Sequence, residues 1–197
     1  MAQTYFNLSS TERTRFDDGN YIYELHNHEG KLMIDIRSMR SMIRKAKPIN
    51  ITVPSNLNYY IDLSRCFYNH EQLIDISELS SFDTSRVVNM EEMFSRCRKL
   101  ASIEPLSDWD VSNVWDMTGT FHACWRLSDL TCLSNWNVRE DCILRGFYSN
   151  RGPFLEPNGP IIWLDGLGIR NNKTSIERYL QAHFPQWLID RHKARGY

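Results

Sequence analysis

The residues best equipped for metal or acid–base chemistry lie in the run His26-Asn27-His28-Glu29-Gly30. Imidazoles and carboxylates bind Zn²⁺, but a metal site needs three or four ligands supported by a second layer of hydrogen bonds. No matching ligand stands elsewhere at a metal-binding spacing, so a polar hairpin loop explains the run better. The chain also contains no nucleophile elbow, phosphate-binding loop or zinc motif. We therefore expect no metal, no cofactor and no enzymatic activity.

A second group of residues suits binding rather than catalysis. It comprises Arg96, Arg98 and Lys99 and, 27 residues after the last two, Trp125 and Arg126. Arg and Trp are the side chains that most often dominate protein–protein contacts. They also pack against each other, with a guanidinium over an indole ring, so a purely structural role for the Arg98–Trp125 pair stays equally open. The sequence thus predicts a partner-binding site at these five residues.

The interval of 27 residues is the period of an internal repeat. Residues 82–108 and 109–135 align without a gap and are identical at nine positions. In the first copy these are Asp83, Ser85, Val87, Met90, Phe94, Cys97, Leu100, Leu106 and Ser107. Weaker copies occupy 55–81 and the residues from Trp136 onward. A fixed period of this length is typical of a solenoid, in which each unit buries its apolar face against its neighbours.

Each copy divides into two halves with different apolar spacing. In residues 87–97 apolar side chains recur every three or four positions, which is the period of an α-helix. Residues 100–106 carry a short apolar ladder, for which we expect one short strand per repeat. The sequence therefore predicts an α/β solenoid of about four 27-residue repeats over residues 55–150.

The outward positions of the predicted strands form a second candidate binding surface. Side chains beside the apolar ladder should point away from the core. We call this set the acidic stripe, and its members are Asp75, Ser102, Glu104 and Asp129. A solenoid usually meets its partner on such a face, although an ordinary solvated face has the same composition.

The string Trp-Asp-x-Ser-Asn-Val-x-x-Met-x-x-x-Phe-x-x-Cys-x-x-Leu at residues 109–127 resembles the BspA-like leucine-rich repeat. Residues 82–100 match it nearly as well, and the resemblance covers about half of the chain. It implies a leucine-rich repeat fold that works by adhesion or recognition, because proteins with this repeat are mostly bacterial or protist surface proteins that bind other proteins. This chain differs in its short array and in lacking a secretion signal.

The flanking regions do not repeat. Residues 1–54 contain two strand-like runs around the His26–Gly30 loop and a basic helical segment from Met39 to Ala46, which predict an N-terminal cap of hairpin and helix. Residues 151–197 begin with a Gly/Pro-rich stretch and continue with a capping-box pattern at 174–177. Pro185 interrupts this helix and a shorter one follows. We interpret the region as a C-terminal helical cap, with a docking helix as the alternative.

Charge is unevenly distributed along the chain. Residues 56–150 hold 8 Lys or Arg against 14 Asp or Glu, whereas residues 1–55 and 151–197 carry net charges of +2 and +3. Phosphate contacts need a basic face, so the acidic repeats argue against general nucleic-acid binding.

The five cysteines include no C-x-x-C pair, and Cys97 and Cys124 stand at the same repeat position. Buried free thiols in a reducing compartment explain this pattern better than disulfides or metal ligands. The chain shows no signal peptide and no apolar run of ~20 residues, so we expect a cytoplasmic protein without a membrane segment.

Together these patterns predict a non-enzymatic protein-recognition module inside the cell. It would be a small inhibitor or adaptor that blocks a protein complex, for example one of bacterial or phage origin. The alternative is a nucleic-acid-linked role, with the acidic stripe as a phosphate mimic or with basic residues near 40–47 and 191–195 contacting RNA or DNA. A fragment of a surface adhesin is a third hypothesis. The partner and the oligomeric state are not specified, and a homodimer stays open.

Overall fold

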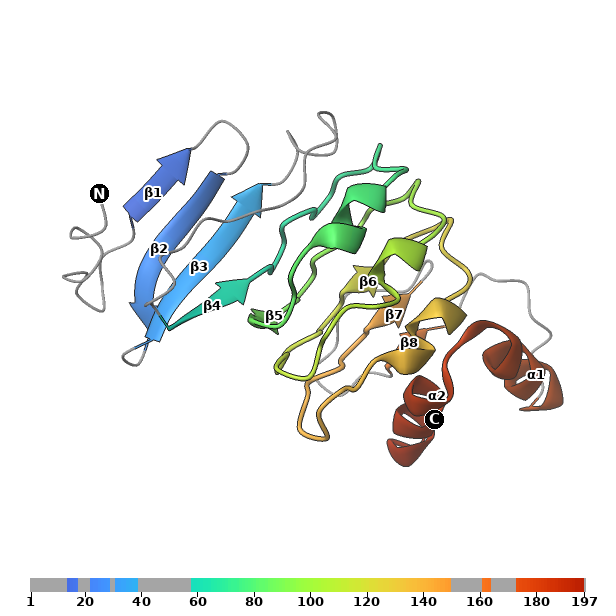
Figure 1. The fold of residues 1–197 in the computed structure, drawn as a ribbon. Helices are drawn as coiled ribbons and strands as arrows, with labels where there is room; N and C mark the ends of the chain where they lie inside the picture. The colour runs from blue at the N-terminus through green and yellow to red at the C-terminus, as the bar shows by residue number, and fades with distance from the viewer. Residues whose placement is uncertain are drawn as a thin grey trace.

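The computed structural model describes residues 14–17, 22–28, 31–38, 58–149, 161–163 and 173–196. They form two small sheets, three short 3-10 helices and two C-terminal α-helices (Figure 1). The first sheet has five strands in the order β1-β2-β3-β4-β5: β1 (Thr14–Asp17), β2 (Ile22–His28), β3 (Lys31–Ser38), β4 (Tyr59–Asp62) and β5 (Val87–Asn89). The second has three: β6 (Phe121–His122), β7 (Tyr148–Ser149) and β8 (Ile162–Trp163).

The first sheet is mixed. Strands β1, β2 and β3 are antiparallel neighbours, whereas β3, β4 and β5 run parallel. The pairing of β2 with β3 confirms the predicted hairpin, and Leu25, Ile34 and Ile36 are buried on its apolar side. The predicted loop is too long, because His26 to His28 belong to β2 and pair with β3. The predicted helix from Met39 to Ala46, with its basic residues, lies outside the described residues.

The prediction of an α/β solenoid is wrong. The described residues form a mixed sheet, a short parallel sheet and two terminal helices, and residues 58–149 contain no α-helix. The half-repeat predicted to be helical begins as strand β5 and continues as tight turns. The half-repeat predicted to be a strand is a 3-10 helix in all three copies: η2 (Ser77–Ser81), η3 (Glu104–Leu106) and η4 (Thr131–Asn135).

Apolar spacing explains why 3-10 helices replace the expected strands. A 3-10 helix has three residues per turn, whereas side chains of a strand alternate every two residues. The ladder in residues 100–106 has apolar residues three apart, and its members Ile103 and Leu106 are buried. The N–H of Leu106 donates to the carbonyl of Ile103 at 2.9 Å, which closes the turn. The three 3-10 helices therefore follow one another in a row (Figure 1).

Left-handed backbone positions explain why the other half-repeat is not an α-helix. One series recurs every 27 residues, at Arg65, Glu92, Gly119 and Gly146, and a second at Asn69, Arg96 and Ala123. A residue in this conformation interrupts an α-helix and leaves N–H groups to find other acceptors. These N–H groups donate to carbonyl oxygens one repeat further along the chain. The N–H of Glu92 donates to the carbonyl of Thr118 at 2.7 Å, and that of Gly119 donates to Arg145 at 2.8 Å.

The core is built from stacked side chains of equivalent positions. The rings of Phe67 and Phe94 lie 5.1 Å apart, and those of Phe94 and Phe121 lie 5.7 Å apart, with interplanar angles of 4° and 5°. Phe147 continues the row edge-on, 5.3 Å from Phe121, and the ring of Trp187 lies 6.0 Å beyond it. Burial of four aromatic rings in one row gives the repeats a continuous apolar interior.

Two helices follow β8, on either side of Pro185 as the sequence predicts: α1 (Lys173–His183) and α2 (Gln186–Ala194). They lie at the end of the molecule away from β1 (Figure 1). Arg191 on α2 donates to the carbonyl oxygens of Arg139 at 2.7 Å and Glu140 at 2.8 Å. Neither helix, nor any other in the described part of the chain, has the length and apolar character that a membrane crossing requires.

Candidate protein-binding face

Glu71, Arg98 and Trp125 stand at the same position of three successive repeats and contact one another in a row. Nη1 of Arg98 lies 3.0 Å from Oε1 of Glu71, and its guanidinium carbon lies 4.3 Å from the centre of the Trp125 ring. The 27-residue register therefore places these side chains one above another, as the sequence predicts for Arg98 and Trp125. A salt bridge on one side and a cation–π contact on the other fix the guanidinium between them.

Trp125 stays accessible in spite of this contact. It is 44% exposed, and a large apolar side chain at that exposure is unusual in this molecule. The guanidinium of Arg98 covers the ring while the rest of the indole faces solvent, so the two interpretations of the pair are compatible. An aromatic side chain that is already held in place loses little conformational entropy when a partner covers it.

The surrounding turns add positive charge. Arg96 lies with its guanidinium carbon 5.7 Å from the centre of the Tyr68 ring, and Lys99 and Arg126 are exposed. We call the following set the turn face: Glu71, Arg96, Arg98, Lys99, Trp125 and Arg126. It holds four of the eight cationic side chains of residues 56–150 against one carboxylate, in a region whose net charge is −6. The turn face is therefore a basic patch on an otherwise acidic array.

The acidic stripe does not lie on strands. Asp75, Ser102 and Asp129 each stand just before a 3-10 helix and accept a hydrogen bond from the N–H two residues on, at 2.8, 3.3 and 2.8 Å. Such contacts are typical of Asp and Ser at turns, where the side chain satisfies backbone N–H groups. All four members, Glu104 included, are exposed. The structure thus gives three of them a local structural role, and binding by the stripe remains a prediction.

Asp83 and Asp110 also accept hydrogen bonds from nearby backbone N–H groups, in the turns that follow the 3-10 helices η2 and η3. Each carboxylate accepts a hydrogen bond from a backbone N–H two residues on at 3.0 Å, from Ser85 and Ser112 respectively. Hydrogen bonds from the hydroxyl and N–H of Ser85 lower the pKa of Asp83, and those of Ser112 lower the pKa of Asp110. Both carboxylates therefore cap tight turns.

Sequence reasoning missed a further pair that joins two repeats. Nε of Arg65 lies 2.7 Å from Oε2 of Glu92, and this carboxylate raises the pKa of Arg65. The pair stands at the 27-residue spacing, so opposite charges at equivalent positions were the signal that could have revealed it. Arg65 is 59% exposed, and an ion pair this accessible contributes little stability.

The five cysteines are free, and four of them are buried, which confirms the prediction of unpaired thiols. The thiols of Cys97 and Cys124 donate to the carbonyl oxygens of Phe67 and Phe94, at 3.2 and 3.1 Å. Burial raises the pKa of Cys97 to about 12 and also raises that of Cys124. Protonated, enclosed thiols are packing residues rather than nucleophiles.

The histidine run near the N-terminus is only partly described. Nδ1 of His26 lies 3.5 Å from Oδ2 of Asp35 on the neighbouring strand β3, while Glu29 lies outside the described residues. Within the described ranges, no three His, Cys, Asp or Glu side chains gather as metal ligands would.

A family model described as "Mycoplasma protein of unknown function, DUF285" matches residues 37–154. The match includes all of the repeats from β4 to β7 and both candidate surfaces. Neither a curated protein nor a solved structure matches the chain.

Proposed function

The chain belongs to the DUF285 family, and because the description of that family assigns no function, we propose one from the geometry of the repeats. The protein is a non-enzymatic recognition module that binds another protein through its turn face. The resemblance of residues 109–127 to BspA-like repeats supports this proposal, because proteins with that repeat mostly bind other proteins.

The observation that carries the proposal is the row Glu71–Arg98–Trp125. Its two contacts, at 3.0 and 4.3 Å, hold an indole in place while leaving it 44% exposed. Binding energy at protein interfaces concentrates in such Trp and Arg side chains. Side chains that keep the same position before and after binding reduce the entropic cost of association.

The charge of the turn face indicates the kind of partner. Lys99 and Arg126 are exposed cations next in sequence to Arg98 and Trp125, and complementary charge speeds association and excludes unsuitable partners. We therefore propose a partner with an acidic patch and an apolar side chain that covers Trp125. An inhibitor or adaptor that blocks a protein complex in the cytoplasm would work in this way.

An affinity capture from native cell lysate tests the proposal. The bait is the full chain, either unchanged or carrying Arg98→Glu, Trp125→Ala and Arg126→Glu. The matched control is Trp115→Ala, because Trp115 is 46% exposed but belongs to a different position of the repeat. We expect a protein that the unchanged chain and the control capture and the triple variant does not, and we expect added salt to weaken its capture. Equal capture by all three baits, or no captured protein, contradicts the proposal.

A second candidate function is supported by the acidic residues. Asp83 and Asp110 are exposed at equivalent repeat positions, and hydrogen bonds from Ser85 and Ser112 lower their pKa values further below neutral pH. A regular row of carboxylates could occupy the basic groove of a nucleic-acid-binding protein. In that case Asp83→Asn with Asp110→Asn would abolish capture, whereas the triple variant of the turn face would retain it.

A further inference from the structure

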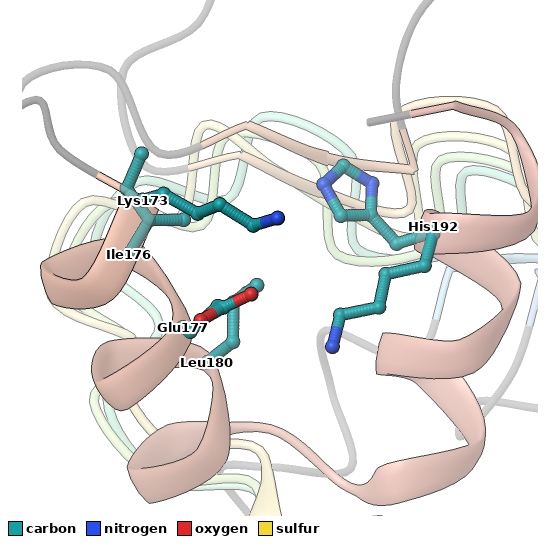
Figure 2. Close-up of a pocket in the computed structure, with 6 residues that line it drawn as sticks. Lys173, Ile176, Glu177, Leu180 and His192 are labelled. Carbon is teal, nitrogen blue, oxygen red and sulfur yellow. The ribbon is translucent and has the colours of Figure 1, made fainter.

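A cavity of about 670 Å³ separates α1 from α2 (Figure 2). One face of α1 lines it with residues at helical spacing, and the last turns of α2 close the other side. The lining residues are Lys173, Ile176, Glu177, Leu180, His192 and Lys193. This volume lies within the range of roughly 300–1,000 Å³ that small-ligand sites occupy. None of these side chains belongs to the turn face, so the cavity is a separate candidate site.

Contacts of α1 and α2 with the repeats explain why a cavity remains between the two helices. On α2, Nε1 of Trp187 donates to the carbonyl of Leu133 at 2.9 Å. At the end of α1, the carbonyl of His183 accepts from the N–H of Leu130 at 2.8 Å. The Phe184 ring then packs 5.1 Å from Tyr148. Each helix is thus anchored to the repeats. The one side-chain hydrogen bond described between the helices, from Gln181 to Gln186 at 3.5 Å, lies where they join, away from the residues that line the cavity.

The lining combines an apolar floor with groups of both charges. Ile176 and Leu180 supply the apolar surface, and Leu180 is buried. Figure 2 shows the ammonium group of Lys173 and the ring of His192 reaching toward each other across the opening, with the Glu177 carboxylate below them. Lys193, which follows His192 on α2, also lines the cavity. His192 is buried, and this burial lowers its pKa to about 4, so that the imidazole is neutral at pH 7.

We propose that this cavity binds a small organic monoanion, a single carboxylate on an apolar stem. Two ammonium groups and one carboxylate leave one positive charge for the ligand to neutralise, and the apolar stem covers Ile176 and Leu180. The Glu177 carboxylate selects against a second negative charge, because like charges repel more strongly where water is partly excluded. A free short-chain carboxylate and the C-terminus of a peptide with an apolar last residue both carry this chemistry.

Octanoate is a suitable probe for the full-length chain. We would titrate it while following the methyl NMR signals of Ile176 and Leu180, with Lys173→Gln/Lys193→Gln as the test variant. Arg178→Gln is the matched control, because Arg178 is an exposed cation of α1 outside the cavity. We expect saturable shifts that the control keeps, and an affinity loss of roughly tenfold or more in the double variant, as for a lost charge-assisted hydrogen bond. Circular dichroism checks that each variant is folded.

Three further ligands sharpen the test. Octanol, which lacks the charge, should bind more weakly than octanoate, and octyl phosphate should bind well only after Glu177→Gln removes the opposing carboxylate. A short peptide with a C-terminal Leu, compared with its C-terminal amide, distinguishes a peptide terminus from a free carboxylate as the source. Absence of shifts at millimolar octanoate overturns the proposal, as do shifts that the double variant leaves unchanged. Capture through the turn face tests the recognition proposal independently.

Discussion

The indole Nε1 of Trp187 donates to the carbonyl of Leu133 at 2.9 Å. Two tryptophans within the repeats make the same contact, since Trp109 donates to Leu79 at 3.0 Å and Trp136 to Leu106 at 2.8 Å. The helix α2 therefore places its tryptophan where the next repeat would have placed one. The Leu133 carbonyl, which already accepts from the N–H of Trp136 at 3.1 Å, thus gains a second donor from a residue 54 positions away.

Substitution of Trp187 tests whether this contact stabilises the fold. We expect Trp187→Phe to lower the free energy of unfolding by about 1 kcal/mol, because it keeps an aromatic ring but removes one of the two hydrogen bonds to the Leu133 carbonyl. Urea unfolding followed by circular dichroism measures the difference. Trp125→Phe serves as the control and should change stability by less than about 0.5 kcal/mol, since Trp125 is largely exposed. Equal effects of the two substitutions would contradict the structural role of Trp187.

The left-handed backbone at Ala123 predicts a stabilising substitution. Its φ is 55°, a conformation that costs a residue with a side chain about 1 kcal/mol and costs glycine little. Ala123→Gly should therefore raise the free energy of unfolding by about 0.5 kcal/mol, after the greater freedom of glycine in the unfolded chain is counted.

A glycine-to-alanine substitution at another left-handed backbone position provides the control. Gly119 is buried with a φ of 61°, so Gly119→Ala should destabilise the protein by about 1 kcal/mol or more. In thermal unfolding, the melting temperature should rise for Ala123→Gly and fall for Gly119→Ala, relative to the unchanged chain. If both substitutions shift the melting temperature in the same direction, the backbone argument fails.

Burial of His192 predicts a loss of stability in mild acid. Its pKa is lowered from 6.5 to about 4, so the unfolded chain takes up the proton more readily than the folded one. The stability that follows from the lowered pKa of His192 is fully present above pH 6.5 and is lost as the pH falls toward 4. The free energy of unfolding falls by up to about 1.4 kcal/mol per pH unit in this range. Urea unfolding at several pH values between 7 and 5 measures this slope.

His192→Gln should flatten that slope but not remove it. Burial also lowers the pKa of His122, which contributes stability with the same sign. A double variant with His122→Gln should flatten the slope further between pH 7 and 5. An unchanged slope in the double variant would show that other groups titrate in this window.

The thiols predict a simple labelling pattern. Cys132 is partly exposed, whereas Cys66, Cys97, Cys124 and Cys142 are buried. With Ellman's reagent at pH 8, we expect one thiol to react before the others, slowly because its pKa is raised to about 11 by burial. The remaining four should react only as the protein unfolds. Cys132→Ser should remove the first phase, and rapid labelling of the buried thiols would contradict the packing described.

Several features of the fold could be predicted from local patterns. Alternating apolar residues predicted the hairpin of β2 and β3, and a capping pattern with Pro185 predicted α1 and α2. The 27-residue register predicted the contact of Arg98 with Trp125, because residues at equivalent positions of adjacent repeats lie side by side. These predictions succeeded because each depended either on the local sequence of a single strand or helix or on the constant 27-residue interval between repeats.

The internal structure of the repeat could not be predicted in the same way. Apolar residues three or four apart fit an α-helix, but they also fit a chain that turns at left-handed residues such as Glu92. Nothing in the spacing distinguishes the two, because the difference lies in whether N–H groups bond within the segment or to the next repeat. The docking of Trp187 and the cavity beside α1 depend on long-range contacts that no local pattern records.

The tryptophan contact at Leu133 has a consequence for how this family can change in length. Successive repeats present the same carbonyl at Leu79, Leu106 and Leu133, and Trp187 of α2 donates to the last of these as the tryptophan of the following repeat does to the others. Duplication of one 27-residue unit would therefore lengthen the array without requiring any new residue at either end. Evolution could adjust the size of the turn face by whole units while the terminal helices stay the same.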